Sequence, residues 1–309
     1  MKIVAGLGAL DAFEKYVLAG ADEVFCGCMP FSWVKKYGIV APLNRREVLL
    51  YNTQIASLSD MRILSRLSEQ TGVKVSVTVN STGYAPSQYP ELMDFFRALA
   101  DLGLNRWIIA DLSLWMEILR AGLPARVHVS GEMGEINRAA LGLYASLGAS
   151  RVIFHRKVSI PEMKALISTH PALEYEAFIL NEKCYYTGAY CNSLHCDEMG
   201  HLCRVPGKIG GIRDASESDE ELREKTLRDV TGESGCGLCA LPKLQKAGVT
   251  HLKLVGRGAR PEKMERDIRA LKTALSLLGE EGFEEKMKRS LFPNGCGGAC
   301  YYEGSGEGI

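Results

Sequence analysis

The chain has 309 residues, 46% of them hydrophobic, which suffices for a buried core in one large domain or two ordinary ones. Its 37 basic residues equal its 37 acidic residues, so no global field recruits nucleic acid or an anionic membrane, although a local patch is not excluded. The first residues carry one lysine, a short apolar run and then charges. Because this fits neither a signal peptide nor a membrane span, we expect a cytoplasmic protein with no membrane partner.

Short apolar runs alternate with segments of helical period along the chain, which predicts repeated βα units around a parallel sheet. The predicted strands are 2–8, 23–28, 73–79, 106–110, 126–130, 151–155, 174–180 and 251–256. The predicted helices are 11–19, 57–71, 89–102, 112–121, 136–147, 160–169, 240–247 and 261–278. In the last helix, a stripe formed by Ile268, Leu271, Leu275 and Leu278 indicates a core-facing surface. Eight strands predict an α/β fold, a (β/α)8 TIM-like barrel.

Two regions interrupt this alternation, residues 29–56 and residues 181–239. Both follow predicted strands, and in a (β/α)8 barrel such loops lie on the face that carries catalysis. We predict a barrel over 1–278, including a long cysteine-rich insertion at 181–239 after the seventh strand. A C-terminal helix and a tail rich in glycine and cysteine complete the chain over 279–309.

Ten cysteines in a chain expected to be cytoplasmic indicate metal ligands or reactive thiols more than disulfides. The long insertion holds six, at Cys184, Cys191, Cys196, Cys203, Cys236 and Cys239. Four thiolates can hold a structural zinc or an iron–sulfur cluster. Only Cys236 and Cys239 have the Cys-x-x-Cys spacing usual in zinc sites. The irregular intervals favour a four-iron cluster, with zinc and unliganded thiols as alternatives.

The other four cysteines form two outlying pairs. Cys26 and Cys28 end the second predicted strand, where small buried side chains are the simpler interpretation. Cys296 and Cys300 stand among glycines, which let a backbone wrap closely around a metal. This second pair is a candidate for a second metal site or for a cover over the first.

Polar residues gather at the predicted strand ends and would converge on one cavity of a closed barrel. They are Asn80, Asp111, Ser130, Glu132, His155, Arg156, Glu176 and Arg257. Each one alone is also explained as a satisfied buried polar group, but for Glu176 and Arg257 we favour a functional role. An arginine at a strand end suits a bidentate hold on a carboxylate or a phosphate.

These patterns together resemble peptidase family U32, collagenase-like proteins that include iron–sulfur hydroxylases of transfer RNA, ribosomal RNA and ubiquinone precursors. The family signature runs from a Glu-x-Phe strand end into a Cys-x6-Cys loop, and its places are filled here by Glu176, Phe178, Cys184 and Cys191. The stretches "AGVTHLKLVGR" (247–257) and "AGADEVFCG" (19–27) resemble two further strands of the family. The resemblance covers most of the barrel.

The chain departs from the family pattern at several places, so it resembles a divergent member. The glycine that follows Glu-x-Phe is Asn181 here, and the glycine before the second cysteine is Ala189. The Arg-Glu pair that usually ends the sixth strand is Arg156 and Lys157.

The resemblance implies a [4Fe-4S] cluster, with Cys184, Cys191 and Cys203 as three ligands. The fourth would be Cys236, with Cys239 as its rival. It also implies oxygen-independent hydroxylation, or related redox chemistry, on a small or nucleic-acid-derived substrate. The residues carried over as catalytic candidates are Glu176, Arg257, Asp111, Asn80 and Arg156.

Two other roles stay open at this point. One is peptide hydrolysis, although the sequence has neither His-Glu-x-x-His nor Gly-x-Ser-x-Gly. The other is a metal-stabilised barrel that serves as partner subunit in a homo- or hetero-oligomer with another U32-type chain. The substrate, whether small molecule, peptide or RNA, is not fixed by the sequence.

Overall fold

The computed structural model describes residues 1–38, 41, 43–44, 53–134, 136–181, 184, 235–258, 260–293 and 300–302. Four of the cysteines discussed above, Cys191, Cys196, Cys203 and Cys296, lie outside the described residues.

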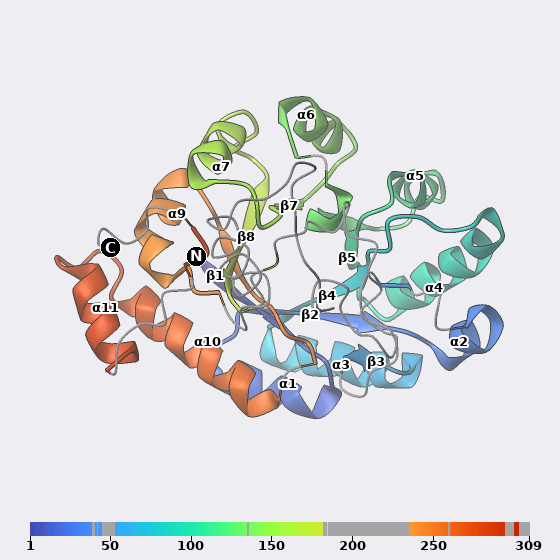
Figure 1. Ribbon diagram of the computed structural model, residues 1–309. Helices are drawn as coiled ribbons and strands as arrows, with labels where there is room; N and C mark the ends of the chain where they lie inside the picture. The colour runs from blue at the N-terminus through green and yellow to red at the C-terminus, as the bar shows by residue number, and fades with distance from the viewer. Residues whose placement is uncertain are drawn as a thin grey trace, which may run out of the picture.

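Eight parallel strands form a closed barrel (Figure 1). They are β1 (Lys2–Gly6), β2 (Glu23–Cys28), β4 (Lys74–Val79), β5 (Arg106–Ile109), β6 (Arg126–Val129), β7 (Arg151–Ile153), β8 (Glu174–Leu180) and β9 (His251–Leu254). Each strand pairs with the next, β9 pairs with β1, and the pairing of β1 with β2 closes the ring. The predicted (β/α)8 architecture is therefore confirmed, and all eight predicted strands are present.

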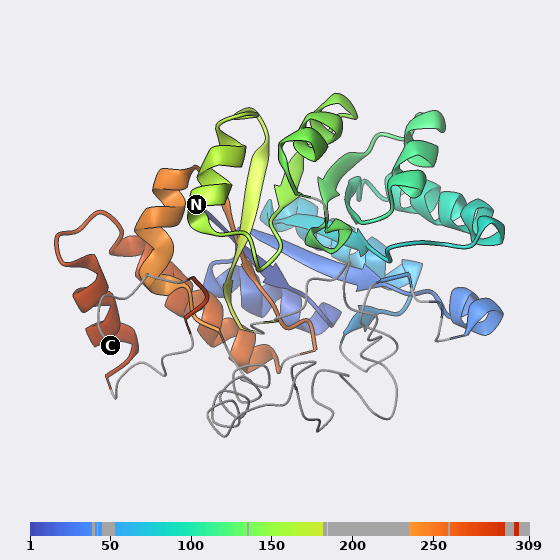
Figure 2. The ribbon, with the colours of Figure 1, turned by 45° about the horizontal axis from the view of Figure 1, so that its top comes forward.

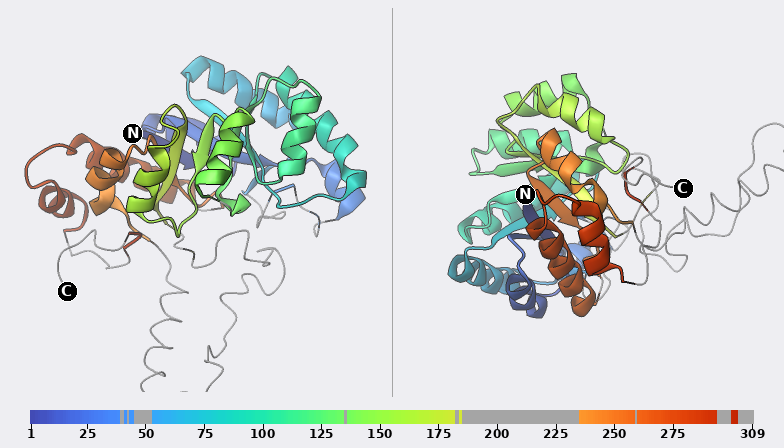
Figure 3. Two further views of the ribbon diagram at one scale, coloured as in Figure 1. Left: turned by 90° about the horizontal axis from the view of Figure 1, so that it is seen from above. Right: turned by 90° about the vertical axis from the view of Figure 1, so that its left-hand side faces the viewer.

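Helices follow the strands and form an outer layer around them (Figure 3). They are α1 (Phe13–Ala19), α2 (Phe31–Tyr37), α3 (Leu58–Thr71), α4 (Tyr89–Asp101), α5 (Leu112–Arg120), α6 (Arg138–Ser146), α7 (Ile160–Ile167), α9 (Leu241–Ala247), α10 (Pro261–Ser276) and α11 (Phe283–Leu291). Within the described residues, no helix has both the length and the apolar character needed to cross a bilayer.

The region 29–56 contains two elements that the alternation of apolar runs and helical segments did not predict. Helix α2 starts after Pro30 and ends before Gly38, whose φ of 71° suits glycine. A two-residue strand, β3 (Gln54–Ile55), extends the sheet beside β2. The strand is too short to show a hydrophobic period. In α2, Trp33 is buried but Phe31 is 77% exposed, so the apolar residues do not mark one face of the helix.

Several helices begin at residues whose side chains satisfy free backbone N–H groups. Ser57 accepts from the backbone N–H of Asp60 at the start of α3, and Asn137 accepts from that of Ala140 at α6. At α7, Ser159 and Glu162 form a reciprocal capping box. These caps fix the residue at which each of the three helices begins.

The core lies mainly between the barrel and the helices. On α10, Ile268 and Leu271 are fully buried, and Leu275, with Leu278 just after the helix, packs at the margin of the same core, so the predicted core-facing stripe is confirmed. This helix lies against α1 and β1 (Figure 1).

The short segment Cys300–Tyr302 returns to the barrel after α11 and lies beside α9 and the end of β8 (Figure 2). The division of the chain at residue 278 stays a prediction.

Candidate functional site

Three segments far apart in the chain meet at the C-terminal end of β8. Leu180 forms an antiparallel bridge with Cys236, and Cys236 forms a parallel bridge with Cys300. The backbone N–H of Asn181 donates to the carbonyl of Gly235 at 2.9 Å, and that of Tyr301 donates to the carbonyl of Cys236 at 2.9 Å. The barrel mouth thus holds the stretch 235–239 and the tail against the strand from which the cysteine-rich insertion departs.

Asn181 turns the chain out of β8. Its φ of 66° lies in the left-handed region, which glycine enters freely and asparagine tolerates better than most residues. This accounts for an asparagine where the family pattern has a glycine. Its side chain donates to the carboxylate of Asp267 on α10 at 2.6 Å, which ties the turn to the outer layer.

Two tyrosines of the tail anchor the junction. The hydroxyl of Tyr301 donates to the carbonyl of Asn181, and the hydroxyl of Tyr302 donates to the carbonyl of Phe178. Both side chains are buried, and burial raises the pKa of Tyr302 well above its ordinary value. A side chain at Gly237 would meet Ile179 and the ring of Tyr302 at 3.1 Å, so the contact is close. The segment Cys300–Tyr302 is therefore an integral part of the barrel mouth.

The described thiols at this mouth are those of Cys184, Cys236, Cys239 and Cys300, and none of them is in a disulfide. Cys184 and Cys300 line the same cavity. Thiolates are soft ligands that suit zinc or iron–sulfur clusters, so the type of donor at the mouth fits such a group. Among the residues that the structure describes, no three Cys, His, Asp or Glu side chains gather closely enough to hold a metal. The predicted ligands Cys191 and Cys203 lie outside those residues.

Cys26 and Cys28, by contrast, are fully buried within β2. Burial raises the pKa of Cys26 to about 12, and it raises that of Cys28 further. A thiol held protonated in an apolar setting is a poor metal ligand. The interpretation of these two residues as small core side chains is therefore supported.

Arg156 lies at the same mouth as the tail. Its guanidinium lies over the ring of Phe178, 4.0 Å from the centroid, and its Nε donates to the hydroxyl of Tyr301 at 3.3 Å. It lines the cavity that Cys184 and Cys300 also line. Of the predicted catalytic candidates, Arg156 is the one that the structure brings to the described cysteines.

Arg257 follows β9 and reaches across the mouth. Its Nη1 donates to the hydroxyl of Thr78, the luminal residue near the end of β4, at 2.8 Å. Gly27 leaves room for this side chain, because a Cβ there would lie 2.6 Å from Nη1 of Arg257, 1.8 Å from Oε1 of Gln54 and 2.8 Å from Nδ2 of Asn44. The side chains of Asn44 and Gln54 are joined by a hydrogen bond of 3.0 Å. We call Asn44, Gln54, Thr78 and Arg257, together with Gly27, the Arg257 cluster.

Asp111 and Asn80 occupy strand ends, as predicted, but are engaged in local structure. Asp111 caps α5, accepting from the backbone N–H groups of Ser113 and Leu114, and it also accepts from the hydroxyl of Tyr89 at 3.1 Å. Asn80 donates to the hydroxyl of Ser130 at 3.4 Å. These contacts explain both residues structurally.

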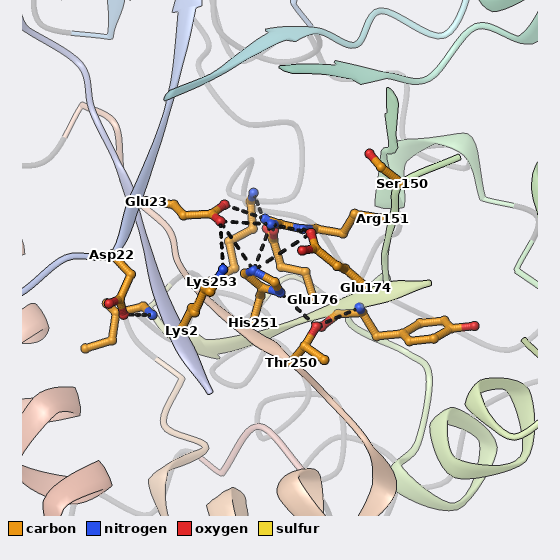
Figure 4. A network of polar contacts seen from close by, with 12 residues as sticks. Lys2, Asp22, Glu23, Ser150, Arg151, Glu174, Glu176, Thr250, His251 and Lys253 are labelled. Carbon is orange, nitrogen blue, oxygen red and sulfur yellow. Dashed lines mark hydrogen bonds and ion pairs between the residues drawn. The ribbon is translucent and has the colours of Figure 1, made fainter. Parts of the chain in front are cut away.

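Glu176 is not at the end of its strand, so the predicted placement was wrong. It is the third residue of β8, and it lies inside the barrel in a buried ionic network (Figure 4). Its two oxygens accept from Nζ of Lys253 at 2.6 Å and from Nη1 of Arg151 at 2.9 Å. The alternation of strand residues correctly predicts a luminal side chain, but it does not give the height in the barrel.

Arg151 is the centre of this network. Its guanidinium contacts Glu23 at 2.8 Å and Glu174 at 2.7 Å, and it lies 2.8 Å from Nε2 of His251. Four of the connected residues, Glu23, Arg151, Glu174 and His251, are the first residues of their strands. The network therefore fills the N-terminal end of the barrel, away from the cysteines.

The charges of the network hold one another in their ionised forms. Burial alone would raise the pKa of Glu176, but Lys253 and Arg151 beside it lower that pKa to about 2. Burial alone would lower the pKa of Arg151, but the adjacent carboxylates raise it. Next to them, His128 is fully buried, and burial lowers its pKa well below the usual value.

Sequence reasoning missed Arg151, Lys253 and the two tail tyrosines. Charged residues inside apolar strands were the available signal for Arg151 and Lys253, since a buried charge requires a partner. The tyrosines carried no such signal, because their contacts join distant parts of the chain.

The fold and the site define a (β/α)8 barrel with thiols and cationic side chains at the end that carries chemistry in such barrels. The family model described as peptidase family U32 matches residues 8–294, and the chain belongs to this family.

Two relatives illustrate the range of the family. The chain is 22% identical over 312 residues to a collagenase of Porphyromonas gingivalis, covering 92% of this chain and 68% of the relative. It is 22% identical over 269 residues to the tRNA hydroxylation protein P of Haemophilus influenzae, covering 85% of this chain and 52% of that protein. The chain thus spans about half of the second relative. A solved U32 peptidase is 17% identical with a TM-score of 0.44, over 58% of this chain and 68% of that one.

Proposed function

We propose that the chain is an iron–sulfur enzyme of family U32 that carries out oxygen-independent hydroxylation, or related redox chemistry, on a nucleic-acid-derived or small substrate, with the oxygen atom taken from a donor molecule other than O2 that is reduced by two electrons. The observation that carries this proposal is that Cys184 and Cys300 line one cavity and that Cys300 pairs through its backbone with Cys236 at the end of β8. The relative named for tRNA hydroxylation supports the same class of reaction.

The cluster would be held by Cys184, Cys191 and Cys203, with Cys236 or Cys239 as fourth ligand. Cys300 is an additional candidate, because its backbone pairs with that of Cys236. When bound, a four-iron cluster supplies electron transfer or Lewis acidity at the mouth.

The chain's own side chains would position the substrate. Arg156 lies beside the thiols and offers a donor fork to an anionic group. Arg257 donates to Thr78 and lies over the ring of Phe25, 5.8 Å from its centroid, and these two contacts suit it to orient a ligand inside the mouth. Asp111 and Asn80 fix the loops around that space. Glu176 lies further inside the barrel, where it accepts hydrogen bonds from Lys253 and Arg151. It would affect the site only by holding the strands in place.

The test is nucleoside mass spectrometry of RNA from cells that lack the gene and from cells that express the wild-type chain or Cys184→Ala. We expect a nucleoside heavier by one oxygen atom with the wild-type chain only, also when the cells grow without oxygen. A modification that persists with Cys184→Ala, or that requires molecular oxygen, contradicts the proposal.

Peptide hydrolysis is the second candidate, supported by the collagenase relative. Cleavage of denatured collagen by purified protein, unchanged by chelators and by Cys184→Ala, would favour it. A third role, as the partner subunit of another U32-type chain, predicts that Arg257→Ala leaves function intact while loss of the cysteines unfolds the insertion.

A further inference from the structure

Each of the eight barrel strands begins with a titratable residue. The first residues, in chain order, are Lys2, Glu23, Lys74, Arg106, Arg126, Arg151, Glu174 and His251. Because the strands are parallel, all of these residues lie at the N-terminal end of the barrel. Lysines and arginines outnumber the glutamates, so this ring carries an excess of positive charge in a chain whose formal net charge is zero.

The glutamates of the ring are taken up by one arc of the barrel. Glu23 and Glu174 contact Arg151 at 2.8 Å and 2.7 Å (Figure 4). Further contacts of Glu23 are with Lys2 at 3.9 Å and with His251 at 3.4 Å. The two carboxylates therefore serve side chains on β1, β7 and β9.

The opposite arc, formed by the adjacent strands β4, β5 and β6, begins with cations alone. Within the described part of the chain, the side chains of Lys74, Arg106 and Arg126 form neither an ion pair nor a hydrogen bond. Glu69 in α3 and Asp101 at the end of α4 precede two of these strands, and among the described residues neither forms an ion pair. This arc thus holds three cations that the fold does not neutralise.

Arg106 and Arg126 are direct neighbours across the sheet. Their Cα atoms are register partners in the pairing of β5 with β6, so their side chains leave the sheet on the same face. Arg106 is half-buried. Burial lowers the pKa of its guanidinium, Glu23 opposes this effect, and the positive charges of Arg126 and Arg151 lower the pKa further. A cation that has lost part of its water and faces like charges is stabilised by an anion bound beside it.

We propose that Arg106 and Arg126, with Lys74 on the next strand, bind a phosphate group at the N-terminal end of the barrel. Guanidinium groups present planar forks of donors that match phosphate oxygens. A phosphate group also carries up to about two negative charges near neutral pH, whereas a carboxylate carries one, so phosphate balances the three cations better. The site lies at the end of the barrel away from the cysteines and does not depend on the proposed redox reaction.

The test is calorimetric titration of the full chain with inorganic phosphate and with glycerol phosphate, in chloride buffer of constant ionic strength. We expect one phosphate group to bind per chain. Arg106→Gln and Arg126→Gln should each weaken this binding by about 10- to 100-fold, because each removes charge-assisted hydrogen bonds. Arg289→Gln on α11 is the matched control and should bind like the wild type, since Arg289 is exposed and already paired with Glu285. Binding of either ligand through the two arginines supports the proposal, and the tighter ligand shows whether the group is taken free or as an ester.

Thermal melting shows that each variant is folded and gives a second readout. Without phosphate, Arg126→Gln should melt at or above the temperature of the wild type, because it removes an unpaired cation next to a like charge. Phosphate should raise the melting temperature of the wild type and of Arg289→Gln more than that of Arg126→Gln. A wild-type chain that binds neither ligand overturns the proposal, as does equal binding by the wild type, Arg106→Gln and Arg126→Gln. Cys184→Ala should bind phosphate like the wild type, so failure of the metal proposal and failure of the phosphate site are told apart.

Discussion

The inside of the barrel and the groove between α7 and α9 use charge in opposite ways. At the N-terminal end, Arg151 is completely buried and each of its partners is a carboxylate or a histidine within the same network. On the outside, between α7 and α9, Lys164 and Lys246 stand exposed around a cavity with no lining carboxylate among the described residues. Paired buried charges stabilise one arrangement of the strands, whereas exposed like charges are held by water. The comparison separates the charges that hold the fold from the charges that face solvent.

The largest effect is expected from Arg151→Met. The substitution leaves Glu23 and Glu176 buried without their common partner, so the free energy of unfolding should fall by about 3–5 kcal/mol. Urea denaturation measures this change.

Lys2→Met is the control at the same end of the barrel. Lys2 is 56% exposed on its side chain and lies 3.9 Å from Glu23, so its removal should cost less than about 1 kcal/mol. Equal losses for the two variants would show that the network does not hold this end of the barrel.

The next effect is an acid sensitivity that originates in the same network. The pKa of Glu176 is lowered from 4.5 in the unfolded chain to about 2 in the folded one. Its contribution to stability is therefore complete above pH 4.5 and is lost as the pH falls towards 2. Unfolding free energies measured between pH 6 and pH 2.5 should show this decline, and the decline should be shallower in Glu176→Gln. An identical pH profile for that variant would mean that Glu176 is not held ionised.

A smaller effect is expected at the mouth from Gly27→Ala. The added Cβ would collide with Oε1 of Gln54 and crowd Arg257, but both are flexible side-chain ends, so the cost should be about 1–3 kcal/mol. Gly142→Ala on α6, where nothing lies within 4 Å, should instead stabilise the protein by about 0.5–1 kcal/mol. Unchanged stability in Gly27→Ala would show that the Arg257 cluster is loosely packed.

The barrel was predictable because its strands are local patterns. The strands Glu23–Cys28 and Glu174–Leu180 match their predicted bounds, since each is a short apolar run with polar or turn residues around it. Helix α2 was missed because Trp33 is its buried residue while Phe31 is 77% exposed, so its apolar residues do not mark one face. Local patterns thus predict an element when its apolar residues mark the buried face.

The site was only partly predictable. The position of Asp111 at a strand end follows from local sequence, and so does the turn at Asn181. The pairing of Cys236 with Cys300 and the burial of Glu176 with Arg151 depend on how distant strands and the tail meet. No local pattern contains that information, and the positions of Cys191 and Cys203 stay predictions.

The most direct test of the central claim compares iron and acid-labile sulfide per chain in anaerobically purified wild type, Cys184→Ala, Cys236→Ala and Cys26→Ala. We predict about four iron and four sulfide in the wild type, a large loss in Cys184→Ala, and a loss in Cys236→Ala if it is the fourth ligand. Cys26→Ala, which removes a buried thiol from β2, should keep its iron. A colourless wild-type protein that carries zinc, or iron content that is the same in Cys184→Ala as in Cys26→Ala, would contradict the account.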